Sequence, residues 1–293
     1  MRFQKTIRKE LLFEGTGLHT GEHVTMRLRP APKDSGVVFY RSDKGAYINA
    51  SITSISDTAF AMTLGSNGTR IKTVEHILAA VSGLGIDNLV IEVDGPEVPI
   101  LDGSSAGFVE KILDAGIVRQ DSQRLYARVI KPLVFKNGHS EIAAFPYEGR
   151  RFTCRIHFDH KFLGSQELSI ELEEGSFARE LAPARTFGFL ENVESLRAAG
   201  LAKGGSLENA VILSDEGVLN STGLRFEDEF VRHKMLDFIG DISLIGFPIF
   251  GHIVASRSGH SANLGFVRKF LDSPDCWEIA SEADHSLQAP VPS

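Results

Sequence analysis

The chain has 293 residues, of which 42% are hydrophobic and 24% charged, which is typical of a globular protein and not of a disordered or membrane-embedded chain. A formal net charge of −7 argues against nucleic-acid binding through a broad basic face, because neutralising phosphates needs clustered Lys and Arg. The sequence has no apolar run of about 18 residues, so we expect no stable membrane insertion. The two cysteines, Cys154 and Cys276, and the absence of a signal peptide favour a cytoplasmic protein.

Short strand-like segments come in runs, and helical patterns lie between these runs. The predicted strands are 23–28, 36–40, 88–93, 126–135, 152–158, 208–213 and 249–255. The predicted helices are 73–82, 105–115, 189–199, 227–245 and 261–271. Runs of strands favour an α+β fold in which helices pack on one face of largely antiparallel sheets. We therefore expect layered α/β sandwiches.

A polar junction at 119–124 separates two halves with a similar order of strands and helices. It predicts an N-terminal domain at 1–122 and a C-terminal domain at 123–271, with a loose polar tail at 272–293. The motifs described below lie in both halves, so we expect the active site at the interface of two similar domains. No extended apolar patch is indicated, and we expect a monomer.

The helix predicted at 227–245 carries polar groups at every fourth position. His233, Asp237 and Asp241 lie on nearly the opposite side from its apolar stripe. A histidine and an aspartate one turn apart can bind one divalent ion, and these donors suit zinc without requiring it. The alternative is a solvated polar face, and a metal site would need a third ligand elsewhere.

His76 is the best candidate for that ligand. Thr73 can cap the helix predicted at 73–82, which places His76 in its first turn. The positive end of the helix dipole disfavours imidazolium and keeps the ring available to a metal. Glu75 would then be a carboxylate beside a metal-bound water, as a general base must be. The alternative is an ordinary acidic first turn.

His260 precedes the helix predicted at 261–271 and is a candidate catalytic group. Asp241 could orient it and stabilise its charged form. Arg257 nearby could contact an anionic substrate group. The alternative for His260 is a loop histidine with no catalytic role.

Several segments together closely resemble the UDP-3-O-acyl-N-acetylglucosamine deacetylases, the zinc enzymes of the committed step of lipid A synthesis. The resemblance covers nearly all of residues 1–271 and is carried by 15–21, 73–76, 83–92, 99–104, 184–189, 223–241 and 258–260. It implies hydrolysis of the N-acetyl group of that UDP-sugar to acetate and a free amino sugar.

The resemblance also implies a role for each matching residue. The zinc ligands would be His76, His233 and Asp237, although two histidines and an aspartate accept Fe²⁺ as well. The catalytic residues it implies are Glu75 as base, Thr186, Lys234 and protonated His260 around the oxyanion, and Asp241 behind His260.

For the substrate, the resemblance implies an apolar acyl channel built from an insert within 184–210. Phe187 and Leu201 could line this channel, or they could belong to an ordinary amphipathic helix. Phe158 matches the aromatic residue that stacks on uracil, and Arg257 stands where the family commonly has a lysine near the diphosphate. The acyl length and the role of His19 stay open.

Two other functions remain as alternatives. A zinc amidohydrolase could act on another N-acyl sugar, because the metal chemistry alone does not select UDP. A lipid- or nucleotide-binding protein could keep the fold without the chemistry. Glu75 and His260 argue against the second alternative, because a binding protein needs no base and acid around one metal.

Overall fold

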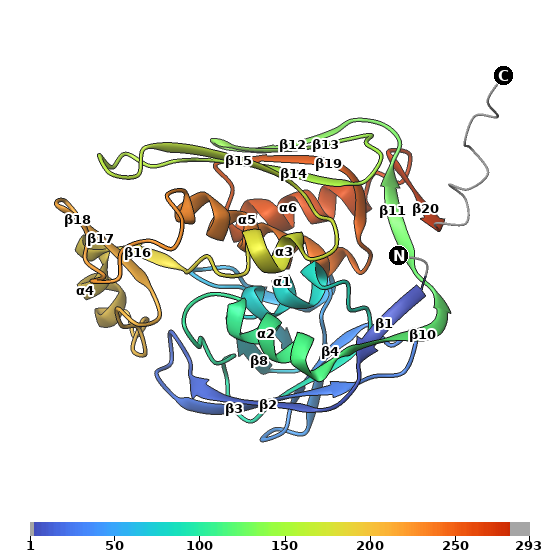
Figure 1. Cartoon of the computed structure of the whole chain (residues 1–293), viewed down its shortest axis with the longest axis horizontal. Helices are drawn as coiled ribbons and strands as arrows, with labels where there is room; N and C mark the ends of the chain where they lie inside the picture. Colours follow the sequence, from blue (N-terminus) through green and yellow to red (C-terminus); the bar gives the residue numbers. More distant parts are fainter. Residues whose placement is uncertain (1–2, 282–293) are drawn as a thin grey trace.

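The computed structural model describes residues 3–281, and Figure 1 shows a sheet on each side of a central layer of helices. The helices are α1 (Glu75–Gly83), α2 (Ala106–Ala115), α3 (Ser176–Glu180), α4 (Leu190–Ala198), α5 (Glu229–Ile242) and α6 (His260–Leu271), with short 3-10 turns at Ile52–Ser54 and Ser243–Ile245.

The first half of the chain forms a mixed five-stranded sheet of order β2-β3-β9-β4-β5 and a three-stranded sheet of order β6-β7-β8. In the larger sheet only β4 and β9 pair in parallel. Alternation places Val24, Met26 and Leu28 of β3 in the core. The strands are β2 (Leu11–Thr16), β3 (His23–Pro30), β4 (Val37–Arg41), β5 (Ala46–Asn49), β6 (Ile55–Asp57), β7 (Thr63–Ser66), β8 (Thr69–Lys72) and β9 (Leu89–Val93).

The second half forms a seven-stranded sheet around β19, which pairs with β11, β13 and β14. A three-stranded sheet of β16, β17 and β18 lies with α4 at one end of the molecule (Figure 1). The strands are β11 (Leu125–Val129), β12 (Leu133–Asn137), β13 (Ser140–Phe145), β14 (Arg150–His157), β15 (Ser165–Glu171), β16 (Phe187–Phe189), β17 (Val211–Ser214), β18 (Gly217–Val218), β19 (Ile249–Ser256) and β20 (Trp277–Ser281).

Helices α1 and α5 approach each other closely at the centre of the molecule. A Cβ atom at Gly240 would lie 2.2 Å from the carbonyl oxygen of Glu75, so only glycine permits this contact. Both faces of α5 are buried: Met235 is 0% exposed, and His233 on the polar side is only 2% exposed. The polar face of α5 is therefore not solvated, and α1 of the first half packs against this helix.

The α+β class is confirmed, and all five predicted helices are present with small shifts at their ends. The predicted cap at Thr73 is wrong: this residue has φ +57°, and α1 begins at Glu75 after the N-cap Val74. The single strand predicted at 126–135 is also wrong. It is divided into β11 and β12, because Pro132 has no N–H to donate to a sheet.

The junction predicted at 119–124 lies mainly on β10 (Ile117–Gln123), which pairs with β1 (Phe3–Ile7). The domain limits at 122 and 271 stay predictions. The loose tail predicted after Leu271 is wrong for Trp277–Ser281, which pairs with β11 as β20. Trp277 stacks on Phe270 with ring centroids 5.3 Å apart, and this apolar contact holds the segment. Residues 282–293 of that prediction lie outside the described residues.

Candidate functional site

Two histidines and one aspartate converge between α1 and α5. His76 lies in the first turn of α1, and His233 and Asp237 lie one turn apart on α5. The Nε2 atoms of His76 and His233 lie 3.6 and 3.3 Å from Asp237 Oδ1. One ligand atom from each residue lies within 4.8 Å of the others, and at most 5% of any of the three is exposed. Two imidazoles and a carboxylate in this arrangement can serve as ligands of a divalent ion.

The hydrogen bond of His233 decides which ring nitrogen faces the other two residues. Its Nδ1 lies 3.1 Å from the carbonyl oxygen of Ala184, and because a carbonyl only accepts, we assign the proton to Nδ1. Burial lowers the pKa of His233 to about 4, so the ring is neutral at pH 7 and its Nε2 carries a lone pair.

Asp237 presents a negative charge to that lone pair. Although burial alone raises its pKa, the interactions of its carboxylate with His233 and Lys234 hold the pKa of Asp237 well below the usual range. Lys234 Nζ donates to its Oδ2 at 2.8 Å, which leaves Oδ1 toward the imidazoles. An Nε2 lone pair 3.3 Å from a carboxylate oxygen is repelled unless a cation lies between them. The residues of this site therefore fit a metal ion.

Glu75, His260 and Asp241 form a second polar group beside the first. His260 Nδ1 donates to Asp241 Oδ2 at 2.8 Å, and Asn263 Nδ2 donates to the same oxygen at 2.7 Å. On the other side of the ring, His260 Nε2 lies 3.7 Å from Glu75 Oε1. The backbone N–H of Met62 donates to Glu75 Oε2 at 3.1 Å. The imidazole is thus held between two carboxylates.

The pKa values of this group separate an acid from a base. Burial alone lowers the pKa of His260, but the charge and hydrogen bond of Asp241 and the charge of Glu75 outweigh burial and raise the pKa to about 9. His260 is therefore protonated at pH 7. Burial raises the pKa of Glu75, which increases its tendency to take a proton. The site can donate a proton from one residue and accept one at the other.

Both groups open into one cavity of about 290 Å³. The lining also includes four other residues that the sequence analysis named as candidates for the site: Thr186, Lys234, Phe158 and Phe187. The remaining lining residues are Leu18, Phe60, Thr73 and Phe189.

Arg257 and Leu201 are not among the described residues that line this cavity. The carbonyl of Arg257 accepts from Ser140 Oγ at 2.7 Å, and the half-buried Leu201 follows α4, with its backbone N–H donating to the Leu196 carbonyl. Their assignment to the substrate stays a prediction.

A buried carboxylate holds the segment that leads into α1. Glu97 is 0% exposed and accepts from Thr73 Oγ1 at 2.7 Å and from the backbone N–H groups of His19 and Thr20 at 2.9 and 2.8 Å. Thr73 has a left-handed backbone, which is strained for a β-branched residue. Glu97 therefore stabilises a strained residue two positions before Glu75.

Sequence reasoning missed Glu229 and Asn263, and helical spacing could have found both. Glu229 lies four residues before His233 and extends the series that continues to Asp237 and Asp241. Asn263 lies three residues after His260 on α6. Residues at these spacings share a helix face with the candidate site residues.

Among residues 3–281, no helix combines the length and the apolar character needed to cross a membrane.

A buried group of two histidines and an aspartate, beside a carboxylate and a second imidazole, is an arrangement typical of metal-assisted hydrolases. The chain belongs to the UDP-3-O-acyl N-acetylglycosamine deacetylase family, whose model matches residues 4–272. The predicted resemblance to this family is thereby confirmed.

Three curated relatives share the name UDP-3-O-acyl-N-acetylglucosamine deacetylase. The protein of Thermodesulfovibrio yellowstonii is 46% identical, and the alignment covers 98% of both chains. The protein of Syntrophotalea carbinolica is 45% identical over 97% of this chain and 93% of the relative. The protein of Myxococcus xanthus is 45% identical over 97% of this chain and 91% of the relative.

Proposed function

We propose that this chain hydrolyses the acetamide of UDP-3-O-acyl-N-acetylglucosamine to acetate and UDP-3-O-acyl-glucosamine, the committed step of lipid A synthesis. One zinc ion would be held by His76, His233 and Asp237, and Fe²⁺ suits the same donors. Membership of the family supports the substrate. The observation that carries the mechanism is that the metal group and the Glu75–His260 pair share one cavity.

The protein's own residues account for the proton transfers. A bound divalent ion would polarise the acetyl carbonyl and lower the pKa of water from about 15.7 towards about 7. Glu75 accepts a proton from the attacking water. His260 donates its Nε2 proton to the departing nitrogen, while Asp241 accepts the Nδ1–H and keeps the ring charged and oriented.

Negative charge develops on the acetyl oxygen as the water adds to the carbonyl carbon. The Thr186 hydroxyl and the Lys234 ammonium line the same cavity and are the groups we assign to this charge. Because Lys234 also donates to Asp237, its ammonium is held in place before substrate binds.

The aromatic wall of the cavity is suited to the rest of the substrate. The Phe158 ring lies edge-on to the Phe187 ring and is tilted relative to the Phe189 ring, with centroid distances of 5.8 and 5.6 Å. We assign Phe158 to the uracil ring and Phe187 to the acyl chain.

A second cavity of about 440 Å³ shares Phe189 with the first and is lined in part by Leu190, Leu213 and Leu219. These apolar residues support a passage for the acyl chain beyond the site, and the same cavity is also lined by the acidic residues Glu191, Asp215 and Glu216. Leu201 is proposed to contact the acyl chain in this region, and Arg257 is proposed to contact the diphosphate.

We also propose that the protein acts as a cytoplasmic monomer. Cys154 and Cys276 are both free thiols, which suits a reducing compartment.

Mass-spectrometric detection of acetate release tests the proposal. Untreated protein, chelated protein and chelated protein given one zinc per chain are compared on the UDP-linked substrate and on an acetamido sugar without UDP. We expect release that is lost on chelation, restored by zinc and confined to the UDP-linked sugar. Release from both sugars would show a less specific amidohydrolase, and no release across several acyl lengths would refute the proposal.

A further inference from the structure

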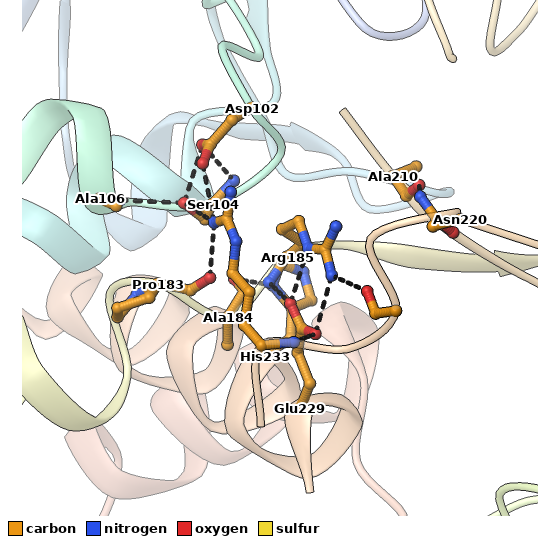
Figure 2. Close-up of polar contacts among 12 residues, drawn as sticks. Asp102, Ser104, Ala106, Pro183, Ala184, Arg185, Ala210, Asn220, Glu229 and His233 are labelled. Carbon is orange, nitrogen blue, oxygen red and sulfur yellow. Dashed lines mark hydrogen bonds and ion pairs between the residues drawn. The ribbon is translucent and has the colours of Figure 1, made fainter. Parts of the chain in front are cut away.

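A buried ion pair joins the segment before Thr186 to the start of α5 (Figure 2). Arg185 and Glu229 are 5% and 0% exposed. Arg185 Nε and Nη2 donate to Glu229 Oε1 and Oε2 at 2.9 and 3.1 Å. The backbone N–H groups of Arg185 and Arg225 donate to the same two oxygens at 3.0 and 2.7 Å. The carboxylate therefore binds donors from two chain segments and is fully satisfied.

The residues on either side of Arg185 both reach the candidate site. The carbonyl of Ala184 accepts the His233 Nδ1–H at 3.1 Å, and Thr186 lines the cavity. Glu229 and His233 are one turn apart on α5. A closed ring of bonds thus runs from the His233 imidazole through Ala184 and Arg185 to Glu229, and back along the helix (Figure 2). This closed ring of bonds fixes the Ala184 carbonyl, which accepts from the His233 imidazole, relative to α5, which carries that imidazole.

We infer that Arg185 and Glu229 are positioning residues that hold the His233 imidazole with Nε2 toward His76 and Asp237. This inference rests on the proposed metal site. Apolar pairs of similar volume are often as stable in a protein interior as a buried ion pair. A charged pair at this position is therefore explained by orientation, since the bidentate fork fixes both distance and angle.

The same helix offers a matched control. Arg232 Nε binds Asp228 Oδ1 at 2.5 Å, and its Nη1 binds Glu180 Oε2 at 3.0 Å. None of these contacts involves Ala184 or the metal group. Removing this second ion pair changes the charge of α5 without opening the ring.

The test measures zinc affinity by competition with a fluorescent chelator, together with the thermal unfolding midpoint of the metal-free protein. Glu229→Gln keeps the shape of the carboxylate without its charge, and Arg185→Lys keeps the charge without the fork. We expect both to bind zinc about 10- to 100-fold more weakly, as is typical when an outer partner of a metal ligand is lost. The zinc affinity of Arg232→Met should stay within about twofold of that of the original chain.

The double variant Arg185→Met, Glu229→Met separates positioning from stability. We expect it to unfold below the original midpoint, because the backbone N–H groups of Arg185 and Arg225 lose their acceptor. Its midpoint should lie above that of Glu229→Gln, which leaves a buried guanidinium without its counter-charge, and it should still bind zinc weakly. The inference would be overturned if the double variant regained both the unfolding midpoint and the zinc affinity of the original chain. It would also be overturned if either single variant bound zinc within about twofold of the original affinity. If Glu229→Gln does not fold, Arg185→Lys and the double variant decide the matter. An original chain that binds no zinc would refute the proposed function itself and the inference with it.

Discussion

Replacing Asp241 by Asn tests the proposed role of His260. The substitution keeps the shape of the side chain but removes the charge that accepts the His260 Nδ1–H at 2.8 Å. The pKa of His260 is raised from 6.5 to about 9, a difference equivalent to about 3 kcal/mol at about 1.4 kcal/mol per tenfold change. Without that charge, burial still opposes protonation and only the weaker effects of Glu75 and Asp237 favour it, so we expect the pKa to fall towards about 6.5.

The protonated fraction of His260 then predicts how the loss of activity depends on pH. A fall in pKa from about 9 to about 6.5 lowers this fraction by less than about twofold at pH 6 and by about 30-fold at pH 8. In the pH profile of kcat/KM of the zinc-loaded enzyme, the alkaline limb should therefore move to lower pH. A loss of equal size at pH 6 and pH 8 would refute a role for His260 as an acid.

Asn263→Ala is the matched control for this experiment. It removes the other donor to Asp241 Oδ2, which lies at 2.7 Å, but leaves the carboxylate charge beside His260. We expect its alkaline limb to stay where it is or to move to higher pH. A shift as large as that of Asp241→Asn would show that general disturbance of the site, and not the charge, moves the profile.

The raised pKa of His260 also predicts a stability difference. A folded pKa of about 9 above the ordinary 6.5 means that protonation stabilises the fold fully below about pH 6.5 and ceases to do so as the pH rises through about 9. Denaturant unfolding of the metal-free protein at pH 6.5 and pH 10 should therefore show a loss of up to about 3 kcal/mol that Asp241→Asn lacks. Equal losses in both proteins would contradict the assignment.

Three further substitutions test the surroundings of the site. Glu75→Gln should leave zinc bound, as measured by metal content, and lower kcat by about 10²- to 10⁴-fold because the base is lost, whereas the exposed Glu110→Gln should leave kcat unchanged. Glu97→Gln keeps an acceptor for Thr73 but weakens the charged hydrogen bonds, so we expect a lower unfolding midpoint and a kcat reduced more than KM is changed; a lower midpoint with normal kcat would show a purely structural role. Gly240→Ala places a methyl group against the Glu75 carbonyl, and we expect about 1 to 3 kcal/mol of destabilisation and weaker zinc binding. An unfolding free energy by calorimetry and a zinc affinity that both equal those of the original chain would contradict this expectation.

Much of the site could be predicted because its residues obey local rules. The four-residue spacing of His233, Asp237 and Asp241 fixes their common helix face whatever the rest of the fold does. The position of His76 in a first helical turn likewise follows from its neighbours. Spacing within one helix cannot show which other helix lies opposite, so the pairing of α1 with α5 depended on the resemblance to the family.

The features that sequence reasoning missed depend on contacts between distant residues. Thr73 adopts a left-handed backbone against its own preference because Glu97, distant in the sequence, accepts its hydroxyl. The short strand β20 follows a polar stretch and pairs with β11, which lies about 150 residues earlier in the sequence. No local pattern contains either partner.

Helix α5 shows why residue type alone could not assign the roles of its acidic groups. Glu229, Asp237 and Asp241 share one buried face, yet each meets a different partner. Glu229 binds a guanidinium, Asp237 faces two imidazoles and an ammonium, and Asp241 binds one imidazole and an amide. A carboxylate oxygen beside the Nε2 lone pair of a neutral imidazole, as Asp237 is beside His233, favours a cation between them. A carboxylate that accepts an imidazole N–H, as Asp241 does from His260, favours the protonated ring. The elements packed against α5 therefore determine which acid is a metal ligand candidate and which one controls a proton.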